Sequence, residues 1–228
     1  MTWTKISIII PVLNEAAIIQ GTLLQLQNES DVEVIVVDGG SRDKTVALAQ
    51  GLGVKVICSP AAGRANQMNT GAAAATGDIL LFLHADTHLP QGYQTMVKET
   101  LSQPKTIAGA FELKIDGKAH SLRLVEKIVN WRSRFLSMPY GDQAIFLKAS
   151  VFEEIGGFPN LPIMEDFQLI RRLQRLGKIA IAPAAVLTSD RRWQKLGVLK
   201  TTLINQLIII GYFLGIPPVK LARLYGRR

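Results

Sequence analysis

Short, continuously apolar segments that alternate with helical patterns constrain the fold of this chain more than any other feature. The first segment, residues 6–12, reads Ile-Ser-Ile-Ile-Ile-Pro-Val, and similar runs recur through the first third of the chain. Apolar runs of roughly four to eight residues between turn signals are typical of strands buried on both faces. We predict strands at residues 6–12, 32–37, 54–58 and 78–83, with helices at residues 16–27, 43–52 and 64–76 between them.

This alternation predicts an α/β fold. Buried strands separated by helices form an open, mostly parallel, twisted sheet with helices on both faces, and ligands bind beyond the carboxyl ends of its strands. No linker divides the chain, so we predict one main domain over residues 1–195 and a C-terminal helical extension over residues 196–228. After Pro90 the alternation loosens, and we predict helices at residues 91–102, 121–136 and 165–176 and strands at residues 106–115 and 144–148.

Composition excludes two classes of protein. Hydrophobic residues make up 48% of the chain, which is incompatible with disorder as its main state. Cys58 is the only cysteine, so an intrachain disulfide is excluded and a reducing compartment fits. The N-terminal apolar run meets Pro11 and Asn14 before it reaches the length of a signal peptide. We therefore predict a cytoplasmic protein, either free or at the inner face of the plasma membrane.

Positive charge is concentrated in the last quarter of the chain. Residues 171–228 hold twelve Lys or Arg residues against the single acid Asp190, whereas the whole chain has a formal charge of +8. Such a surplus fits nucleic acid, an anionic membrane surface or a phosphorylated substrate. No nucleic-acid-binding motif accompanies it, so we expect no nucleic-acid partner.

An apolar stretch lies within this basic region, at residues 203–216. It is followed by Lys220, Arg223, Arg227 and Arg228, a combination typical of helices that lie in a membrane interface. A helix needs about 20 apolar residues to span a bilayer, so this stretch is too short to cross alone. Two interpretations stay open: peripheral membrane association, or packing on the same domain or on a second subunit in a homodimer.

Polar side chains follow three of the predicted strands at the point where each strand ends. Asn14 and Glu15 follow the first strand, Asp38 follows the second, and Asp86 lies in the sequence His-Ala-Asp-Thr-His after the fourth. Because the carboxyl ends of parallel strands meet at one edge of a sheet, we expect these groups to converge.

A nucleoside diphosphate suits these groups. Asp38 can accept hydrogen bonds from a base or from ribose hydroxyls, and Gly39 lets the backbone approach a ligand closely. No basic residue lies near Asp86 in the sequence, so its carboxylate is well placed to hold a hard divalent cation that bridges two phosphates. Arg64, at the start of a predicted helix, is either a phosphate contact or a solvated residue.

In this order and spacing, the motifs resemble those of the family 2 glycosyltransferases. The resemblance covers residues 5–195 and implies the A-type nucleotide-sugar-binding fold. It also implies inverting transfer of a sugar from a nucleoside diphosphate sugar, with uridine as the base, to an acceptor hydroxyl, assisted by Mg or Mn. The motifs are Pro-Val-Leu-Asn-Glu (11–15), Val-Val-Asp-Gly-Gly-Ser-Arg-Asp-Lys-Thr (36–45), the helix with Arg64, Asn66, Asn69 and Gly71, Asp-Ile-Leu-Leu-Phe-Leu-His-Ala-Asp (78–86), Gly-Gly-Phe-Pro (156–159), Glu-Asp (165–166) and Arg-Arg-Trp (191–193).

The resemblance gives roles to residues of the donor site. Pro11, Asn14 and Glu15 would line the base and ribose, and Asp38 would read the base. The further predicted donor contacts are Gly39, Arg64, Asn69, Asp86 and Trp193. Trp193 is either a residue that stacks on a sugar or a core residue.

Asp86 corresponds to the last acid of the family's Asp-x-Asp metal motif. His84 replaces the first acid, so phosphate and water would supply most of the metal ligands. His84 and His88 are either additional ligands or structural residues.

Asp166 resembles the family's general base, because inversion requires one group to remove the proton of the acceptor hydroxyl. Glu165 would orient a loop or the acceptor, and Arg191 and Arg192 would offset the charge of the leaving diphosphate. A simpler interpretation is that Glu165 and Asp166 are first-turn acids that interact with the helix dipole. Gly-Asp-Gln at residues 141–143 is either a turn or part of the sugar pocket. We expect Asp38, Asp86 and Asp166 to surround one pocket.

A narrower resemblance links the chain to a bacterial subgroup labelled arsenosugar-biosynthesis glycosyltransferases. Two other functions stay open, a sugar-phosphate nucleotidyltransferase and a non-catalytic module that binds nucleotide or membrane. Nucleotidyltransferases usually carry a Gly-rich loop with Arg and Lys after the first strand, where this chain has Asn14 and Glu15.

Overall fold

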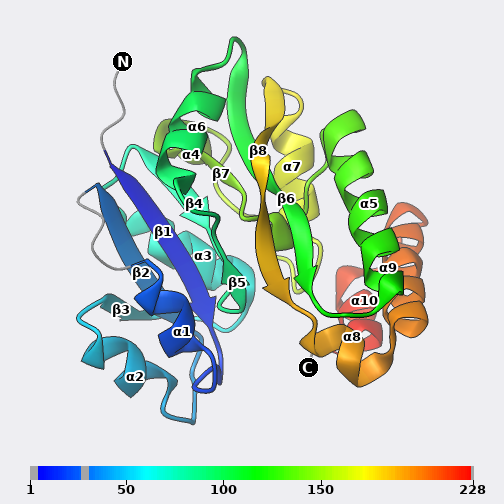
Figure 1. Ribbon diagram of the computed structural model, residues 1–228, viewed down its shortest axis with the longest axis horizontal. Coiled ribbons are helices and arrows are strands. Elements are labelled where there is room, and N and C mark those ends of the chain that lie inside the picture. The colour runs from blue at the N-terminus through cyan, green and yellow to red at the C-terminus, as the bar shows by residue number, and fades with distance from the viewer. Residues whose placement is uncertain (1–4, 27–30, 227–228) are drawn as a thin grey trace.

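A computed structural model describes residues 5–26 and 31–226 of the protein (Figure 1). The strands are β1 (Ile6–Val12), β2 (Val32–Asp38), β3 (Lys55–Cys58), β4 (Ile79–Phe82), β5 (Thr87–His88), β6 (Thr106–Asp116), β7 (Phe146–Lys148) and β8 (Lys178–Ser189). The α-helices are α1 (Ile19–Leu24), α2 (Thr45–Gly51), α3 (Arg64–Ala73), α4 (Tyr93–Ser102), α5 (His120–Phe135), α6 (Ala149–Glu154), α7 (Glu165–Leu173), α8 (Arg191–Leu196), α9 (Val198–Phe213) and α10 (Pro218–Tyr225), and a 3-10 helix, η1, covers Gly141–Gln143.

The strands form one sheet in the order β3-β2-β1-β4-β7-β6-β8-β5. Strands β3, β2, β1 and β4 are parallel, and β6 is parallel to β8. Strand β7 runs antiparallel to both β4 and β6 and so joins the two parallel blocks, and β5 runs antiparallel to β8. The predicted α/β fold with a mostly parallel sheet is therefore confirmed.

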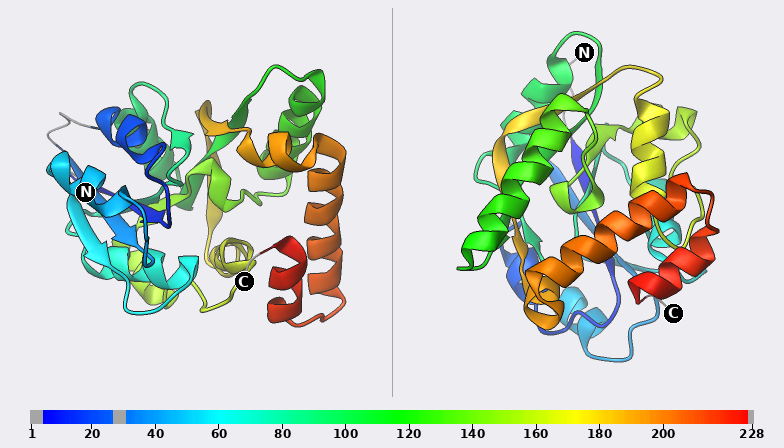
Figure 2. Two further views of the ribbon diagram at one scale, coloured as in Figure 1. Left: turned by 90° about the horizontal axis from the view of Figure 1, so that it is seen from below. Right: turned by 90° about the vertical axis from the view of Figure 1, so that its right-hand side faces the viewer.

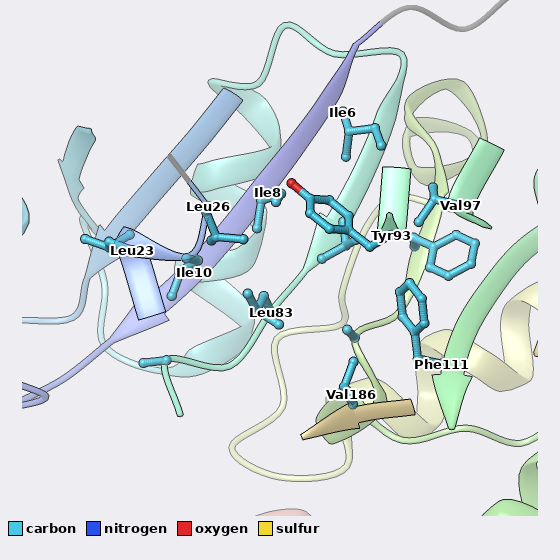
Figure 3. Packing of buried hydrophobic residues seen from close by; sticks show 14 of the residues in the cluster. Ile6, Ile8, Ile10, Leu23, Leu26, Leu83, Tyr93, Val97, Phe111 and Val186 are labelled. Atoms are coloured by element: carbon cyan, nitrogen blue, oxygen red, sulfur yellow. The ribbon is translucent and has the colours of Figure 1, made fainter. Parts of the chain in front are cut away.

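Apolar side chains pack on both faces of the sheet, which explains why the strands are continuously apolar. Successive side chains of a strand point to opposite faces. Ile8 and Ile10 of β1 belong to the cluster under α1 and α4 (Figure 3), whereas Ile9 belongs to the cluster under α3. The sheet is thus covered by helices on both sides, as the sequence predicts.

The long strand β8 is the main element that sequence reasoning misses. Its sequence is rich in alanine and contains Pro183, which cannot donate a hydrogen bond in a sheet. The pairing of β6 with β8 shifts register at Pro183, where Ala110 pairs with Ile181 and Glu112 with Ala185. This bulge accommodates the exposed proline within an otherwise paired strand.

Some predicted boundaries also differ. Helix α1 is shorter than predicted at residues 16–27, and Gln27 lies outside the described residues.

The C-terminal helices pack against α7, as Figure 2 shows from two further directions. Phe167 of α7 shares a buried cluster with Ile208 of α9 and Leu221 of α10. A C-terminal helical extension is thus confirmed, and the domain boundary at residue 195 stays a prediction. No helix within the described part of the chain is long and apolar enough to cross a membrane. Arg227 and Arg228 lie outside the described residues.

Candidate active site

The carboxyl ends of β1, β2 and β4 meet at one edge of the sheet. Val12, the last residue of β1, pairs with Asp38 at the end of β2. On the other side of β1, the N–H of Leu83 donates a hydrogen bond to the carbonyl oxygen of Ile9 at 3.0 Å. The predicted polar loops therefore begin at the same edge.

Asp38 is buried and holds the turn that follows β2. Its Oδ2 accepts hydrogen bonds from the N–H groups of Gly40 at 2.9 Å and Ser41 at 3.0 Å. A Cβ at Gly39 would lie 3.0 Å from Cδ of Gln67, whose amide donates to the carbonyl oxygens at the ends of β1 and β2. Gly39 therefore lies close to the side chain of Gln67. The recognition of a nucleotide base by Asp38 stays a prediction.

The loops after β1 and β2 are tied together by hydrogen bonds. Asn14 has a left-handed backbone conformation with φ of 56°. Its Oδ1 accepts from the N–H of Arg42 at 2.8 Å, and its own N–H donates to Oγ of Ser41 at 2.9 Å. The N–H of Glu15 donates to Oγ1 of Thr45 at 2.8 Å. These bonds fix the two loops as one rim, with Glu15 at its side.

A partly exposed ionic cluster lies beside this rim, around Arg191 at the start of α8. Arg191 Nη1 lies 3.0 Å from Glu15 Oε2, and Nη2 lies 3.0 Å from Asp86 Oδ2. The Arg191 side chain is 47% exposed and each carboxylate side chain 25%. The premise that no basic residue neutralises Asp86 is therefore wrong, because Arg191 reaches it from 105 residues further along the chain.

The groups around Asp86 do not fit a resident metal ion by themselves. Mg²⁺ and Mn²⁺ require several oxygen ligands, and Asp86 is already paired with a guanidinium. His84 Nε2 accepts a hydrogen bond from Arg64 Nη1 at 3.0 Å, so its side chain is engaged with Arg64. Among residues 5–26 and 31–226, no group of three His, Cys, Asp or Glu side chains could hold a metal ion. The predicted Mg or Mn stays a prediction.

A second, buried ionic cluster surrounds Arg64 at the start of α3. Its guanidinium forms an ion pair with Glu165 and lies 3.7 Å from Asp166 Oδ2. The Glu165 side chain is 0% exposed and that of Arg64 is 22% exposed. Burial alone would lower the pKa of Arg64, but Glu165 and Asp166 raise it above its ordinary value. Arg64 is therefore a charged structural partner of both acids.

Asp166 is held in place by its surroundings. Its Oδ2 accepts a hydrogen bond from the N–H of Gly141 at 2.8 Å, and its Oδ1 from the N–H of Phe167 at 2.8 Å. A Cβ at Gly141 would lie 3.0 Å from Oδ2, so a larger residue there would crowd the carboxylate. Burial raises the pKa of Asp166, but the Arg64 charge and these two hydrogen bonds outweigh it and lower the pKa below its ordinary value.

Asp166 faces a cavity of about 150 Å³ between α7, α9 and α10. Of the three acids expected to share a pocket, only Asp166 is among the described residues that line this cavity. A much smaller cavity, of about 10 Å³, is lined by both Pro11 of β1 and Asp166. The larger cavity is lined by Arg64, His84, Tyr140, Asp142, Ile163, Met164, Asp166, Phe167, Asn205, Ile208, Ile209 and Tyr225.

Asp142 is a second acid on the wall of the cavity. Its Oδ1 is buried without a hydrogen-bond partner among the described residues. Burial and the nearby charge of Asp166 raise the pKa of Asp142 to about 6, against the opposing effect of Arg132 and Arg64. Two neighbouring carboxyl groups with pKa values moved in opposite directions are a common feature of acid–base sites.

Comparison with known families shows which family the chain belongs to. The family described as Glycosyl transferase family 2 matches residues 7–158, which is more than half of the chain. The chain belongs to glycosyl transferase family 2. The predicted family is thus confirmed, and the narrower arsenosugar subgroup stays a prediction.

Curated relatives of this family 2 chain match it in part. An uncharacterized glycosyltransferase of Rickettsia bellii is 38% identical over 94 residues, which are 41% of this chain and 32% of that protein. The probable glycosyltransferase YdaM of Bacillus subtilis is 26% identical over 212 residues, which cover 80% of this chain and 50% of YdaM. This chain therefore spans half the length of these relatives or less.

Solved structures share the fold. The mannosyltransferase PcManGT of Pyrobaculum calidifontis, in complex with GDP-Man and Mn²⁺, has a TM-score of 0.65 at 21% identity, covering 82% of this chain and 60% of its own. Glucosyl-3-phosphoglycerate synthase of Mycobacterium tuberculosis, in complex with phosphoglyceric acid, has a TM-score of 0.63 at 20% identity, covering 90% of this chain and 79% of its own. These likenesses confirm the predicted fold.

Three predicted site residues of the family 2 chain make other contacts in the described structure. Asn69 holds the Gly-Gly-Phe-Pro turn, because its amide exchanges two hydrogen bonds of 2.9 Å with the backbone of Phe158. Arg192 stacks on the ring of Tyr225 at 3.7 Å, and Trp193 packs against the core under α1 and α4. Their roles at the donor or the diphosphate stay predictions.

Sequence reasoning misses several residues around the site. Arg191 is predicted near the diphosphate, but nothing in the Arg-Arg-Trp motif indicates its pairing with Asp86. Tyr140 directly precedes Gly-Asp-Gln, so that motif was an available signal for it. Asn205 and Tyr225 come from the C-terminal helices, and no sequence signal links them to Asp166.

Proposed function

We propose that this chain transfers a sugar from a nucleoside diphosphate sugar to an acceptor hydroxyl, with inversion at the anomeric carbon and Asp166 as general base. The position of Asp166 carries the proposal: a carboxylate with a lowered pKa lies on the wall of a cavity next to the carboxyl edge of the sheet. Family membership supports glycosyl transfer, and relatives of the same fold bind GDP-Man and UDP-GlcNAc.

The donor is proposed to bind at the rim formed by the loops after β1 and β2, with Pro11, Asn14 and Asp38 near the base and ribose. A uridine base is proposed from the family resemblance. Arg191 lies beside this rim and is paired with two carboxylates that are partly exposed. A guanidinium binds carboxylate and phosphate with similar geometry. Arg191 would therefore exchange one carboxylate for a phosphate oxygen when the donor binds.

In the proposed reaction Asp166 accepts the proton of the acceptor hydroxyl while the acceptor oxygen bonds to the anomeric carbon. The bond from that carbon to the diphosphate oxygen breaks, and the electron pair leaves with the diphosphate. Glu165 would act as a positioning residue, because it is fully buried and paired with Arg64. Asp142 would bind an acceptor hydroxyl through its unpaired Oδ1.

Arg64 is proposed to control the pKa of the base, Asp166. A lowered pKa keeps Asp166 ionised at neutral pH but makes it a weak proton acceptor. Arg64 would therefore hold Asp166 in the ionised form that can accept the hydroxyl proton.

A non-catalytic nucleotide-binding module is the second candidate. The pairing of Asp86 with Arg191 favours it, because the predicted metal ligand is already neutralised. A nucleotidyltransferase receives no support, since the loop after β1 carries Asn14 and Glu15 and not a basic Gly-rich sequence.

The first test is a panel of nucleoside diphosphate sugars, each with and without Mn²⁺. A ligand that binds only the folded protein raises its melting temperature by mass action. We expect stabilisation by a uridine donor and release of nucleoside diphosphate in the presence of an acceptor. Tight binding without any turnover would favour the non-catalytic module.

The second test is Asp166→Asn, compared with Glu153→Gln at an exposed position of α6. We expect donor affinity to be preserved and transfer to fall by roughly 10²- to 10⁴-fold, which is typical for loss of a general base. The Glu153→Gln control should keep the parent rate. Transfer by Asp166→Asn at near the parent rate would show that another group removes the proton.

A further inference from the structure

Helix α9 carries an exposed apolar stripe along its whole length. The exposed apolar residues of this stripe are separated by four, four, three and four positions, so they lie on one side of the helix. The opposite side of α9 is buried, because Thr201 and Ile208 face the interior. The exposed side chains of the stripe are Leu199, Leu203, Leu207, Ile210 and Leu214, the last directly after the helix end.

Helix α5 carries a second stripe of the same kind. Leu124, Ile128, Trp131 and Phe135 are all exposed and are spaced by four, three and four residues. Helices α5 and α9 are in contact, and the right panel of Figure 2 shows both on the side of the molecule that faces the viewer. The two stripes lie on contacting helices, and we call their exposed residues together the α5–α9 face.

The charges around the α5–α9 face are almost all positive. Lys127, Lys200 and Lys220 are exposed on α5, α9 and α10. The only acid in these three helices is Glu126, and its carboxylate is occupied by the N–H of Ile115 and by Arg123. A second copy of this chain would bring the same positive charges together, so charge disfavours a homodimer through this face.

We propose that the α5–α9 face docks on an anionic lipid bilayer. Apolar side chains flanked by lysines combine burial at the acyl boundary with attraction to anionic headgroups. The exposed indole of Trp131 lies within the face, and tryptophan favours the membrane interface. Docking requires no turnover. It goes beyond the proposed transfer reaction and can be tested separately from it.

Docking would bring the cavity close to the bilayer. The outer side of α9 belongs to the α5–α9 face, whereas Asn205, Ile208 and Ile209 of the same helix line the cavity with Asp166. A helix with its side chains is about 10–12 Å thick. The candidate base would therefore lie roughly one helix diameter above the headgroups, and the acceptor hydroxyl would be presented there.

Sedimentation of the full chain with vesicles tests the docking. We expect binding to vesicles of phosphatidylcholine mixed with phosphatidylglycerol and little binding to phosphatidylcholine alone. Binding should weaken at about 0.5 M salt, because salt screens the attraction between exposed charges. Absence of binding to the anionic vesicles at low salt would overturn the proposal.

Paired variants locate the surface. Leu203→Gln with Leu207→Gln should weaken partition onto anionic vesicles by about tenfold or more, because two apolar side chains are removed from the face. The matched control is Leu24→Gln with Leu176→Gln, whose side chains are 56% and 49% exposed on α1 and after α7, compared with 60% for Leu203. Equal weakening in both pairs would overturn the assignment to this face.

Tryptophan fluorescence gives a second readout that does not depend on activity. Transfer of Trp131 into the interface should shift the emission of the parent to shorter wavelength when anionic vesicles are added, and Trp131→Phe should lose most of the shift. A protein that forms a dimer through these leucines and shows no lipid-dependent shift would overturn the proposal in favour of self-association.

Discussion

The two ionic clusters of this chain have the same composition but different surroundings. Each consists of one arginine and two carboxylates, and in each the arginine is distant in sequence from the acids that it holds. Arg64, 22% exposed, holds the fully buried Glu165 and the 17% exposed Asp166. Arg191 is 47% exposed, and the Glu15 and Asp86 side chains that it holds are each 25% exposed. A buried pair is costly to break, and an exposed pair contributes little to stability. The buried cluster therefore suits a fixed catalytic geometry, and the exposed cluster suits exchange with a substrate.

The largest effect on stability is expected from the buried cluster. Arg64→Gln leaves Glu165 charged and buried without its cation, which typically costs about 3–5 kcal/mol. We expect urea unfolding to show this loss, with little change for Arg175→Gln at an exposed position after α7. A loss below about 1 kcal/mol would mean that water reaches Glu165 and that the two clusters do not differ in burial.

The second effect depends on pH and concerns Asp142, which lies next to the buried cluster. Its pKa is raised from 3.8 to about 6, so the folded protein holds this proton more tightly than the unfolded chain. The parent should therefore lose stability as pH rises from about 4 to about 6 and keep this penalty, roughly 2–3 kcal/mol, at higher pH.

Asp142→Asn removes the titrating group and should be more stable than the parent at about pH 8 and equally stable at about pH 4. Thermal unfolding at both pH values measures the difference. The control Asp116→Asn, at an exposed position of β6, should show no such change. A constant difference at both pH values would contradict a raised pKa for Asp142.

The smallest effect on stability is expected at the exposed cluster. Arg191→Gln should change the free energy of unfolding by less than about 1 kcal/mol, because its ion pairs are partly solvated. Donor affinity, measured by calorimetric titration with the best ligand of the nucleotide panel, should fall by about tenfold through loss of a charged contact to phosphate. Unchanged affinity would remove Arg191 from the donor site.

The sequence predicts the first four strands and the edge at which their loops meet, because continuous apolar runs leave few alternatives to a buried parallel sheet. It does not predict β8, whose alanines and Pro183 hide the strand pattern, or the pairing of Asp86 with Arg191. Asp86 and Arg191 are 105 residues apart, so their contact depends on the path of the chain from β8 into α8. The same reason explains why Tyr225, close to the C-terminus, was not predicted at the cavity of Asp166.

The central claim is that donor binding and proton removal depend on different clusters. A double-mutant cycle of Arg191→Gln and Asp166→Asn tests it most directly, with donor affinity and single-turnover transfer at saturating donor measured for all four proteins. We predict that Arg191→Gln changes only affinity, that Asp166→Asn changes only the transfer rate, and that the two effects add within about 0.5 kcal/mol. Loss of donor affinity in Asp166→Asn as large as that in Arg191→Gln would contradict the claim.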